Sequence, residues 1–347
     1  MPTDRWVRTM LGVIAVIAIF AALSVGSFVI APVVCAIFVI ALVWPMQSRL
    51  QRRMPKLIAL AIVIAVIALV VVIFASLVSW AFGWIGRSVV ANAGRFQSLY
   101  GEVTAWLEGH GVVVAGLWAE HFNMSWLIRT MQGVTARLNN AVTFWLVVLV
   151  YVILGLLEVD DLKRRLTTLE YRDGARLLLA GGAAIAEKFR RYMLIRTMMS
   201  LATGVLVFGL AALFGLQLAA EWGILAFALN YIPFIGPFVA TVFPTLYALA
   251  QFESWQAALA IFVCLNIIQF VIGSYVEPRV AGNVLAISPF LVLFSVFLWT
   301  YLWGLFGAFI GVPIAIAILT LCAQHPSSRW VADVLGGSRQ QTAGKES

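Results

Sequence analysis

The sequence predicts an all-α, polytopic integral membrane protein with about eight transmembrane helices. Of its 347 residues, 63% are hydrophobic and 11% are charged, whereas a soluble domain carries about 25% charged residues. Apolar runs recur along most of the chain, and a helix that crosses a bilayer needs about 20 such residues. These runs are continuous, as in residues 57–80, and lack the short alternating segments of a membrane β-barrel. The chain is therefore predicted to be helical and surrounded by lipid.

Residues 1–82 are predicted to hold the first three transmembrane helices. The first apolar run breaks at Ala31-Pro32, a second continues to Trp44, and a third covers residues 57–80. The loop at residues 47–56 has no acidic residue and four basic ones: Arg49, Arg52, Arg53 and Lys56. By the positive-inside rule this loop and the N-terminus are cytoplasmic. The same residues suit anionic lipids, so the net charge of +8 predicts lipid partners and no nucleic acid.

The rest of the chain divides by composition into four predicted regions. Residues 83–140 carry sparse mixed charges with tryptophan and leucine at helical spacing, which predicts an external amphipathic helical region. Residues 141–196 hold the fourth transmembrane helix and a basic cytoplasmic segment that ends at Arg196. Residues 197–323 form a C-terminal transport core with few charges. Residues 324–347 are predicted to be a disordered cytoplasmic tail.

A first break is predicted inside the long apolar run of residues 222–250. Pro233 and Pro237 each lack a backbone donor, and Gly236 between them frees the backbone, so a continuous helix is not expected. In lipid, such a break needs polar partners from protein or a watery cavity. Transporters use broken helices to present backbone groups and side chains, here Asn230, to a substrate. A kinked hairpin that serves packing alone is the alternative, and the run either crosses the membrane or re-enters it.

A second break is predicted in the apolar run of residues 287–322, which is too long for one upright span. Its candidate residues are Gly304, Gly307, Gly311 and Pro313. Three glycines at this spacing give a smooth face for close helix packing. They are equally compatible with a segment that lines a transport path.

Between the two breaks, Glu277 and Arg279 flank Pro278 at the end of a predicted span. Ionisable groups at membrane depth are costly, so they tend to be paired and functional. Glu277 is therefore a candidate proton or ion group, and Glu277 together with Arg279 would gate or couple transport. An interfacial loop whose charges contact water is the alternative.

These segments resemble the autoinducer-2 exporter (AI-2E) family of bacterial membrane proteins. The family signature Asn-x-Ile-Pro-x-x-Gly-Pro is similar to residues 230–237, and residues 276–282, Ser288-Pro289 and Val312-Pro313 follow in the same order. The resemblance covers residues 189–321. It implies about eight spans, an external insertion, homo-oligomers and the bacterial inner membrane, with both termini cytoplasmic. It also implies export of a small hydrophilic signalling molecule, and some relatives look like sodium–proton antiporters.

The chain departs from the family pattern at two positions. Where the family commonly has Gly-Lys and His-Pro pairs, this sequence has Gly282-Asn283 and Ser288-Pro289. Two titratable groups are thereby missing. A coupling mechanism carried over from relatives is therefore not assumed for this chain.

Three functions fit these observations. The leading hypothesis is a secondary transporter that exports a small polar solute through a site built from both broken segments. The alternatives are a cation–proton antiporter that uses Glu277 and a non-transporting scaffold. An enzyme is not predicted, because the three histidines lie outside the spans and no His-Glu-x-x-His motif occurs. No ATP-binding motif occurs either, so we expect no cofactor and no metal.

Overall fold

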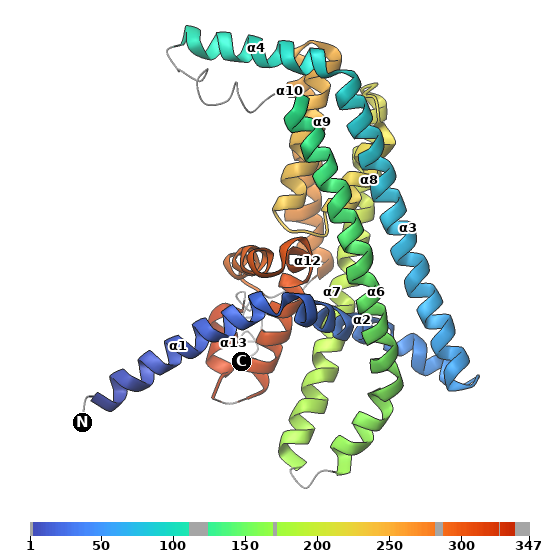
Figure 1. Cartoon of the computed structure of the whole chain (residues 1–347), viewed down its shortest axis with the longest axis vertical. Helices are drawn as coiled ribbons and strands as arrows, with labels where there is room; N and C mark the ends of the chain where they lie inside the picture. The colour runs from blue at the N-terminus through green and yellow to red at the C-terminus, as the bar shows by residue number, and fades with distance from the viewer. Residues whose placement is uncertain (1–2, 111–123, 169–171, 282–286, 326, 337–347) are drawn as a thin grey trace, which may run out of the picture. The chain divides into compact units, whose positions relative to one another are not determined.

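The computed structural model describes residues 3–110, 124–168, 172–281, 287–325 and 327–336, and these are almost entirely helical (Figure 1). The helices are α1 (Thr3–Val25), α2 (Ser27–Gln51), α3 (Lys56–Ala91), α4 (Ala93–Gly109), α6 (Met124–Thr168), α7 (Arg172–Leu213), α8 (Ala219–Leu229), α9 (Ile235–Phe252), α10 (Trp255–Phe270), α11 (Glu277–Ala281), α12 (Pro289–Gln324) and α13 (Arg329–Leu335). A π-helix, η1 (Val271–Val276), joins α10 to α11. Among the described residues the only β contact is a bridge between Ile287 and Gly336.

Within the part of the chain that the structure describes, eight helical segments are long and apolar enough to cross a membrane. They are Trp6–Val25, Ser27–Gln51, Lys56–Ala91, Val142–Thr168, Leu179–Leu213, Ile235–Phe252, Trp255–Ala281 and Pro289–Gln324. Many of their large apolar side chains are exposed, which suits a lipid solvent and not water. The predicted all-α polytopic membrane fold is confirmed.

The chain forms two compact units. Unit 1 consists of Met1–Ala65, Phe144–Met193 and Gly282–Ser347, and unit 2 of Val66–Thr143 and Leu194–Ala281. The long helices α3, α6 and α7 contribute residues to both. The predicted transport core of residues 197–323 is therefore divided between the units.

In unit 2, α8 and α9 fold back on each other as an antiparallel pair, which we call hairpin A. Gln251 Nε2 donates to the Gly215 carbonyl at 2.8 Å at the open end, and the Trp222 and Tyr247 rings are 5.6 Å apart in the middle. With 11 residues α8 is about 16 Å long, half the thickness of the hydrocarbon layer. The predicted break is thus a reversal of direction, and the apolar run is not a single span.

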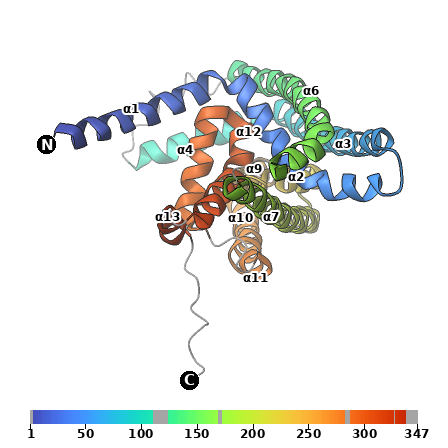
Figure 2. The ribbon, with the colours of Figure 1, turned by 90° about the horizontal axis from the view of Figure 1, so that it is seen from below.

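In unit 1, α12 also reverses direction, and we call its two halves, residues 289–303 and 305–324, hairpin B. Gly304 has a φ of 62° and a ψ of −142°, a conformation that glycine adopts readily and other residues rarely adopt. Beyond it, a Cβ atom on Gly311 would lie 2.9 Å from the Ser295 carbonyl oxygen, so the two halves touch. Figure 2 shows the bend in α12.

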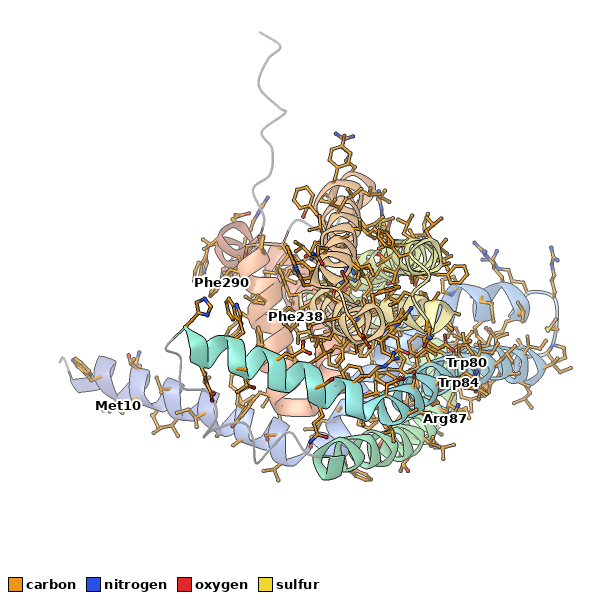
Figure 3. The ribbon with its side chains drawn as sticks, turned by 90° about the horizontal axis from the view of Figure 1, so that it is seen from above. Met10, Trp80, Trp84, Arg87, Phe238 and Phe290 are labelled. Atoms are coloured by element: carbon orange, nitrogen blue, oxygen red, sulfur yellow. The ribbon has the colours of Figure 1, made fainter. Side chains whose placement is uncertain are left out.

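The core of unit 2 surrounds hairpin A. Trp222, Tyr247, Ile261 and Leu265 are almost fully buried, together with Val207 from α7. At the far end of α3 the Arg87 guanidinium lies 4.4 Å from the Trp84 ring centroid, next to half-exposed Trp80 (Figure 3). Tryptophan is typical of the membrane–water interface.

Several predicted boundaries differ from the structure. The first helix ends at Gly26 and not at Ala31-Pro32, because α2 runs through both Pro32 and Pro45. A Cβ atom at Gly26 would come within 2.9 Å of the Ala22 carbonyl oxygen, so the tight junction needs glycine there. The fourth candidate span begins at Val142, next to its predicted start at residue 141, although the helix α6 itself begins earlier, at Met124. Residues 111–123 and 337–347 of the predicted external region and tail lie outside the described residues, and α13 lies inside the predicted tail.

Candidate functional site

The crossing of α7 and α8 positions the candidate site in unit 2. A Cβ atom on Gly204 would lie 2.9 Å from the Gly223 carbonyl oxygen, and one on Gly223 would lie 2.8 Å from the Gly204 carbonyl oxygen. The two backbones are therefore in direct contact, as small-residue pairs permit between membrane helices. One to two turns farther on, this crossing brings the tip of hairpin A against α7.

Asn230 and Tyr231, at the tip of hairpin A, are hydrogen-bonded to α7. Asn230 is 6% exposed and its Nδ2 donates to Ser200 Oγ at 3.3 Å. The Tyr231 hydroxyl donates to Thr197 Oγ1 at 3.0 Å. Buried polar groups require such partners, so the tip fits against a polar strip on α7.

The backbone of the tip explains its proline and glycine residues. Pro233 occupies the turn, and Phe234 has a φ of 63°, which is uncommon for a bulky residue. Pro237 lies in the first turn of α9, where its missing donor costs nothing. A Cβ atom on Gly236 would occupy the place of the Leu229 carbonyl group, so only glycine allows the two helices to approach this closely.

Glu277 forms an ion pair with Arg196 of α7. Arg196 Nη1 donates to Glu277 Oε1 at 2.8 Å and to Oε2 at 3.0 Å, and the two side chains are 8% and 18% exposed. Glu277 follows directly on the π-helix η1, and such segments occur frequently at functional sites. One turn of α7, from Arg196 to Ser200, thus joins Glu277 to Asn230.

The guanidinium of Arg196 has an unused donor. Among the residues that the structure describes, no acceptor lies within hydrogen-bond distance of its buried Nε. A buried donor without a partner costs about 1–3 kcal/mol, so this atom is suited to an acceptor that arrives from outside the protein. The pair presents this donor beside a carboxylate, so a donor and an acceptor lie next to each other at this place.

The structure pairs Glu277 with Arg196 and not with Arg279, and a joint role of Glu277 and Arg279 in gating or coupling stays a prediction. Residues two apart on a helix point in different directions, and Glu277 turns to Arg196. Arg279 is exposed and its guanidinium lies 3.8 Å from the Tyr275 ring centroid, while Pro278 is exposed in α11. Arg196 was likewise predicted to belong to the cytoplasmic basic segment, but it is 6% exposed inside α7.

The candidate residues of hairpin B serve packing in unit 1. A Cβ atom on Gly307 would occupy the place of the Trp299 carbonyl group, and Gly311 approaches Ser295 in the same way one turn on. Gly304 forms the turn, and Pro313 is buried in the second half. Because hairpin B belongs to unit 1 and hairpin A to unit 2, one site built from both segments remains a prediction.

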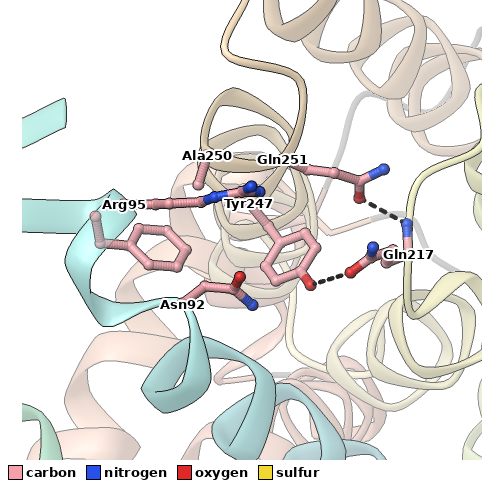
Figure 4. A pocket seen from close by; sticks show the side chains of 7 residues that line it. Asn92, Arg95, Gln217, Tyr247, Ala250 and Gln251 are labelled. Carbon is pink, nitrogen blue, oxygen red and sulfur yellow. Dashed lines mark hydrogen bonds between the residues drawn. The ribbon is translucent and has the colours of Figure 1, made fainter. Parts of the chain in front are cut away.

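A small pocket lies at the open end of hairpin A, away from its tip (Figure 4). Its lining consists of Asn92, Arg95, Phe96, Gln217, Tyr247, Ala250 and Gln251. The Tyr247 hydroxyl lies 2.7 Å from Ser88 Oγ and donates to Gln217 Oε1 at 3.1 Å. Tyr247 and Gln217 bond to each other, and Gln251 bonds to the backbone of Gln217 and Gly215, so this network fastens the loop before α8.

Arg196, Ser200 and Thr197 are the site residues that the sequence analysis missed. Together with Thr203, which is buried, they form a polar strip at helical spacing in the otherwise apolar second half of α7, residues 193–213. That spacing was the available signal, and counting Arg196 among the cytoplasmic charges concealed it. Among the described residues no group of three or more His, Cys, Asp or Glu side chains is placed to hold a metal ion.

Comparison with known proteins gives a consistent set of relatives. A family model described as AI-2E family transporter matches residues 11–326. The chain is 25% identical over 331 residues to the AI-2 transport protein TqsA of Escherichia coli (strain K12), which covers 94% of each chain. Two further relatives both carry the name "Putative transport protein". The relative from Haemophilus influenzae is 24% identical over 343 residues, which cover 95% of this chain and 96% of the relative. The relative from Borreliella burgdorferi is 34% identical over 155 residues, which cover 44% of this chain and 43% of the relative.

Proposed function

The chain belongs to the AI-2E transporter family, and from that premise we propose that it exports a small polar solute, such as a signalling molecule, as a secondary transporter. The solute site in this proposal is the polar cluster between the tip of hairpin A and α7. The protein acts in the bacterial inner membrane, with both termini in the cytoplasm.

The observation that carries this proposal is the buried pair of Arg196 and Glu277 among apolar helices. Charged groups within transmembrane segments are costly and are typical of substrate and ion pathways. Here the pair lies next to a reversed helix, and one of its donors is free. Arg196 Nε donates to the solute, the Glu277 carboxylate accepts from it, and Asn230 adds an amide. Without an ATP-binding motif, the driving force is an ion gradient or the gradient of the solute.

Solute efflux from proteoliposomes tests this assignment. AI-2 is the first solute to measure, because TqsA is named for its transport. We expect Glu277→Gln and Arg196→Gln to abolish efflux, while the exposed Arg279→Gln serves as the matched control. Variants that are folded and transport as well as the parent would remove the site from this cluster.

Cation–proton exchange is the second candidate that the sequence raised, and the ion pair weighs against it. Both Glu277 oxygens already accept from Arg196 Nη1, so a cation that bound this carboxylate would first have to displace the guanidinium. Proton movement on addition of sodium to the same vesicles distinguishes the two activities. Sodium-dependent proton flux that Glu277→Gln eliminates would favour the antiporter.

A further inference from the structure

Unit 1 brings together two basic segments that lie far apart in the sequence. Lys56 Nζ, at the start of α3, donates to the Leu157 carbonyl of α6 at 2.7 Å. Lys163 Nζ of α6 lies 4.3 Å from the Trp44 ring centroid of α2. These two contacts fix the loop between α2 and α3 against the C-terminal end of α6.

The two segments that these contacts join carry a group of exposed basic side chains, which we call the basic patch. It consists of Arg49, Arg52, Arg53, Lys56, Lys163, Arg164 and Arg165, all of which are exposed. The same stretch of α6 carries three acidic residues, Glu158, Asp160 and Asp161, so basic side chains outnumber acidic ones by seven to three. In the described part of the chain the ion pairs lie elsewhere, at Arg95–Glu253 and Arg196–Glu277. The patch therefore keeps a clear excess of positive charge.

The patch lies where three candidate spans end. Ser27–Gln51 finishes, Lys56–Ala91 begins and Val142–Thr168 finishes at this surface. Leu57 and Leu162, which are 70% and 57% exposed, lie beside the basic residues and present apolar surface to lipid. Basic side chains next to exposed leucines match the chemistry of a phospholipid, in which a charged phosphate and apolar acyl chains are joined in one molecule.

We propose that the basic patch binds the phosphate headgroup of an anionic phospholipid. Trp44 and the aliphatic stem of Lys163 form one wall of the site, and the arginines of the α2–α3 loop and α6 surround the phosphate. Arginine suits this role because its planar guanidinium donates two parallel hydrogen bonds to phosphate oxygens. The site is independent of the transported solute and of the cluster at hairpin A.

Lipid titration of the full-length protein in neutral detergent, followed by native mass spectrometry, tests the proposal. Phosphatidylglycerol is the probe, with phosphatidylcholine as the neutral lipid. The Arg53→Gln/Arg164→Gln variant loses two charges of the basic patch. The control variant, Arg8→Gln/Arg329→Gln, loses two exposed charges on α1 and α13. Within unit 1, Figures 1 and 2 show these two helices away from the α2–α3 loop. Each basic residue at an anionic surface changes lipid affinity about fivefold, so we expect the patch variant to bind phosphatidylglycerol about 25-fold more weakly. The control variant should bind it as the parent does.

Three results would overturn the proposal. If the patch and control variants bound phosphatidylglycerol with equal affinity, the position of the charges would not matter. If the parent bound phosphatidylcholine as tightly as phosphatidylglycerol, the charge of the headgroup would not matter. Displacement of the lipid by millimolar inorganic phosphate would assign the site to a free anion. Melting temperatures in neutral detergent that match the parent ensure that any loss of binding does not reflect unfolding.

Discussion

Hairpins A and B reverse direction by the same means but surround their tips with different chemistry. Each has a glycine shortly after the tip that lies against a backbone carbonyl group of the preceding helix. Gly236 lies against the Leu229 carbonyl in hairpin A, and Gly307 lies against the Trp299 carbonyl in hairpin B. At the tip of hairpin A, Asn230 is buried and bonded to α7. At the tip of hairpin B, Trp303 Nε1 donates to the Leu23 carbonyl of α1 at 2.9 Å, and the surrounding contacts are aromatic. A break in an apolar run thus indicates a reversal, and the polar side chains around it indicate a site.

The largest effect is expected where the hairpins are alike. In Gly307→Val and Gly236→Val a side chain would occupy the place of the Trp299 or Leu229 carbonyl group. A backbone carbonyl cannot move aside by a rotamer change, so we expect destabilisation of about 3 kcal/mol or more and little folded protein. Thermal unfolding in detergent measures the loss. Gly209→Val in α7 is the control, because nothing lies within 4 Å of its added Cβ atom, and a parent-like melting temperature in either hairpin variant would contradict the close approach.

The next effect separates the two hairpins, because only hairpin A lies beside a buried ion pair. Arg196→Leu leaves the Glu277 carboxylate buried without its partner, which costs about 3 kcal/mol. Replacing both partners is often close to neutral, so Arg196→Leu/Glu277→Leu should recover much of the stability. We expect this double variant to show no solute efflux. Unfolding and efflux measured on the same samples test both statements, and efflux by the double variant would make the pair structural only.

A smaller effect compares one polar side chain from each hairpin. Asn230→Ala removes the hydrogen bond to Ser200 and should lower stability by about 1 kcal/mol. If the amide also binds solute, the efflux rate should fall about tenfold. Thr300→Val in hairpin B removes only a bond from the hydroxyl to the Val296 carbonyl of its own helix, so efflux should match the parent. Equal losses in both variants would mean that the two tips share the function.

The smallest effect is expected from Arg279→Gln. This guanidinium is exposed and contacts the Tyr275 ring, an interaction that contributes about 0.5–1 kcal/mol at such sites. Efflux should be close to that of the parent. A loss of efflux with unchanged melting temperature would instead give Arg279 a direct role in transport.

Composition and hydropathy were sufficient to predict the membrane fold and both helix breaks. The Pro233, Gly236 and Pro237 pattern located the first reversal, and the glycines from Gly304 located the second. Hydrophobic patterning reports which segments lie in lipid and where helices stop, so these features are local in the sequence. Ser288-Pro289, one departure from the family pattern, also has a local explanation. Ser288 Oγ accepts from the Leu291 backbone amide at 3.2 Å, and Pro289 occupies the first helical position.

The candidate site could be predicted only in part. Asn230 and Glu277 were chosen as candidates because polar residues are rare in the C-terminal half of the chain, and their role stays a prediction. Their partners on α7 were not, because Ser200 and Asn230 are 30 positions apart and Arg196 and Glu277 are 81 positions apart, and only tertiary packing brings them together. Sequence spacing favoured Arg279, two positions away, whereas helix geometry turns its side chain aside.

The π-helix before Glu277 makes the ion pair depend on chain length as well as on residue type. In η1 the backbone bonds span five residues, so one residue is accommodated beyond the number that an α-helix would use. Without that residue, everything after it would rotate by about 100° around the helix axis, and Glu277 would face lipid instead of Arg196. A single inserted residue in an apolar helix is therefore sufficient to turn a carboxylate inward. Deleting that residue would abolish the ion pair without altering any polar residue.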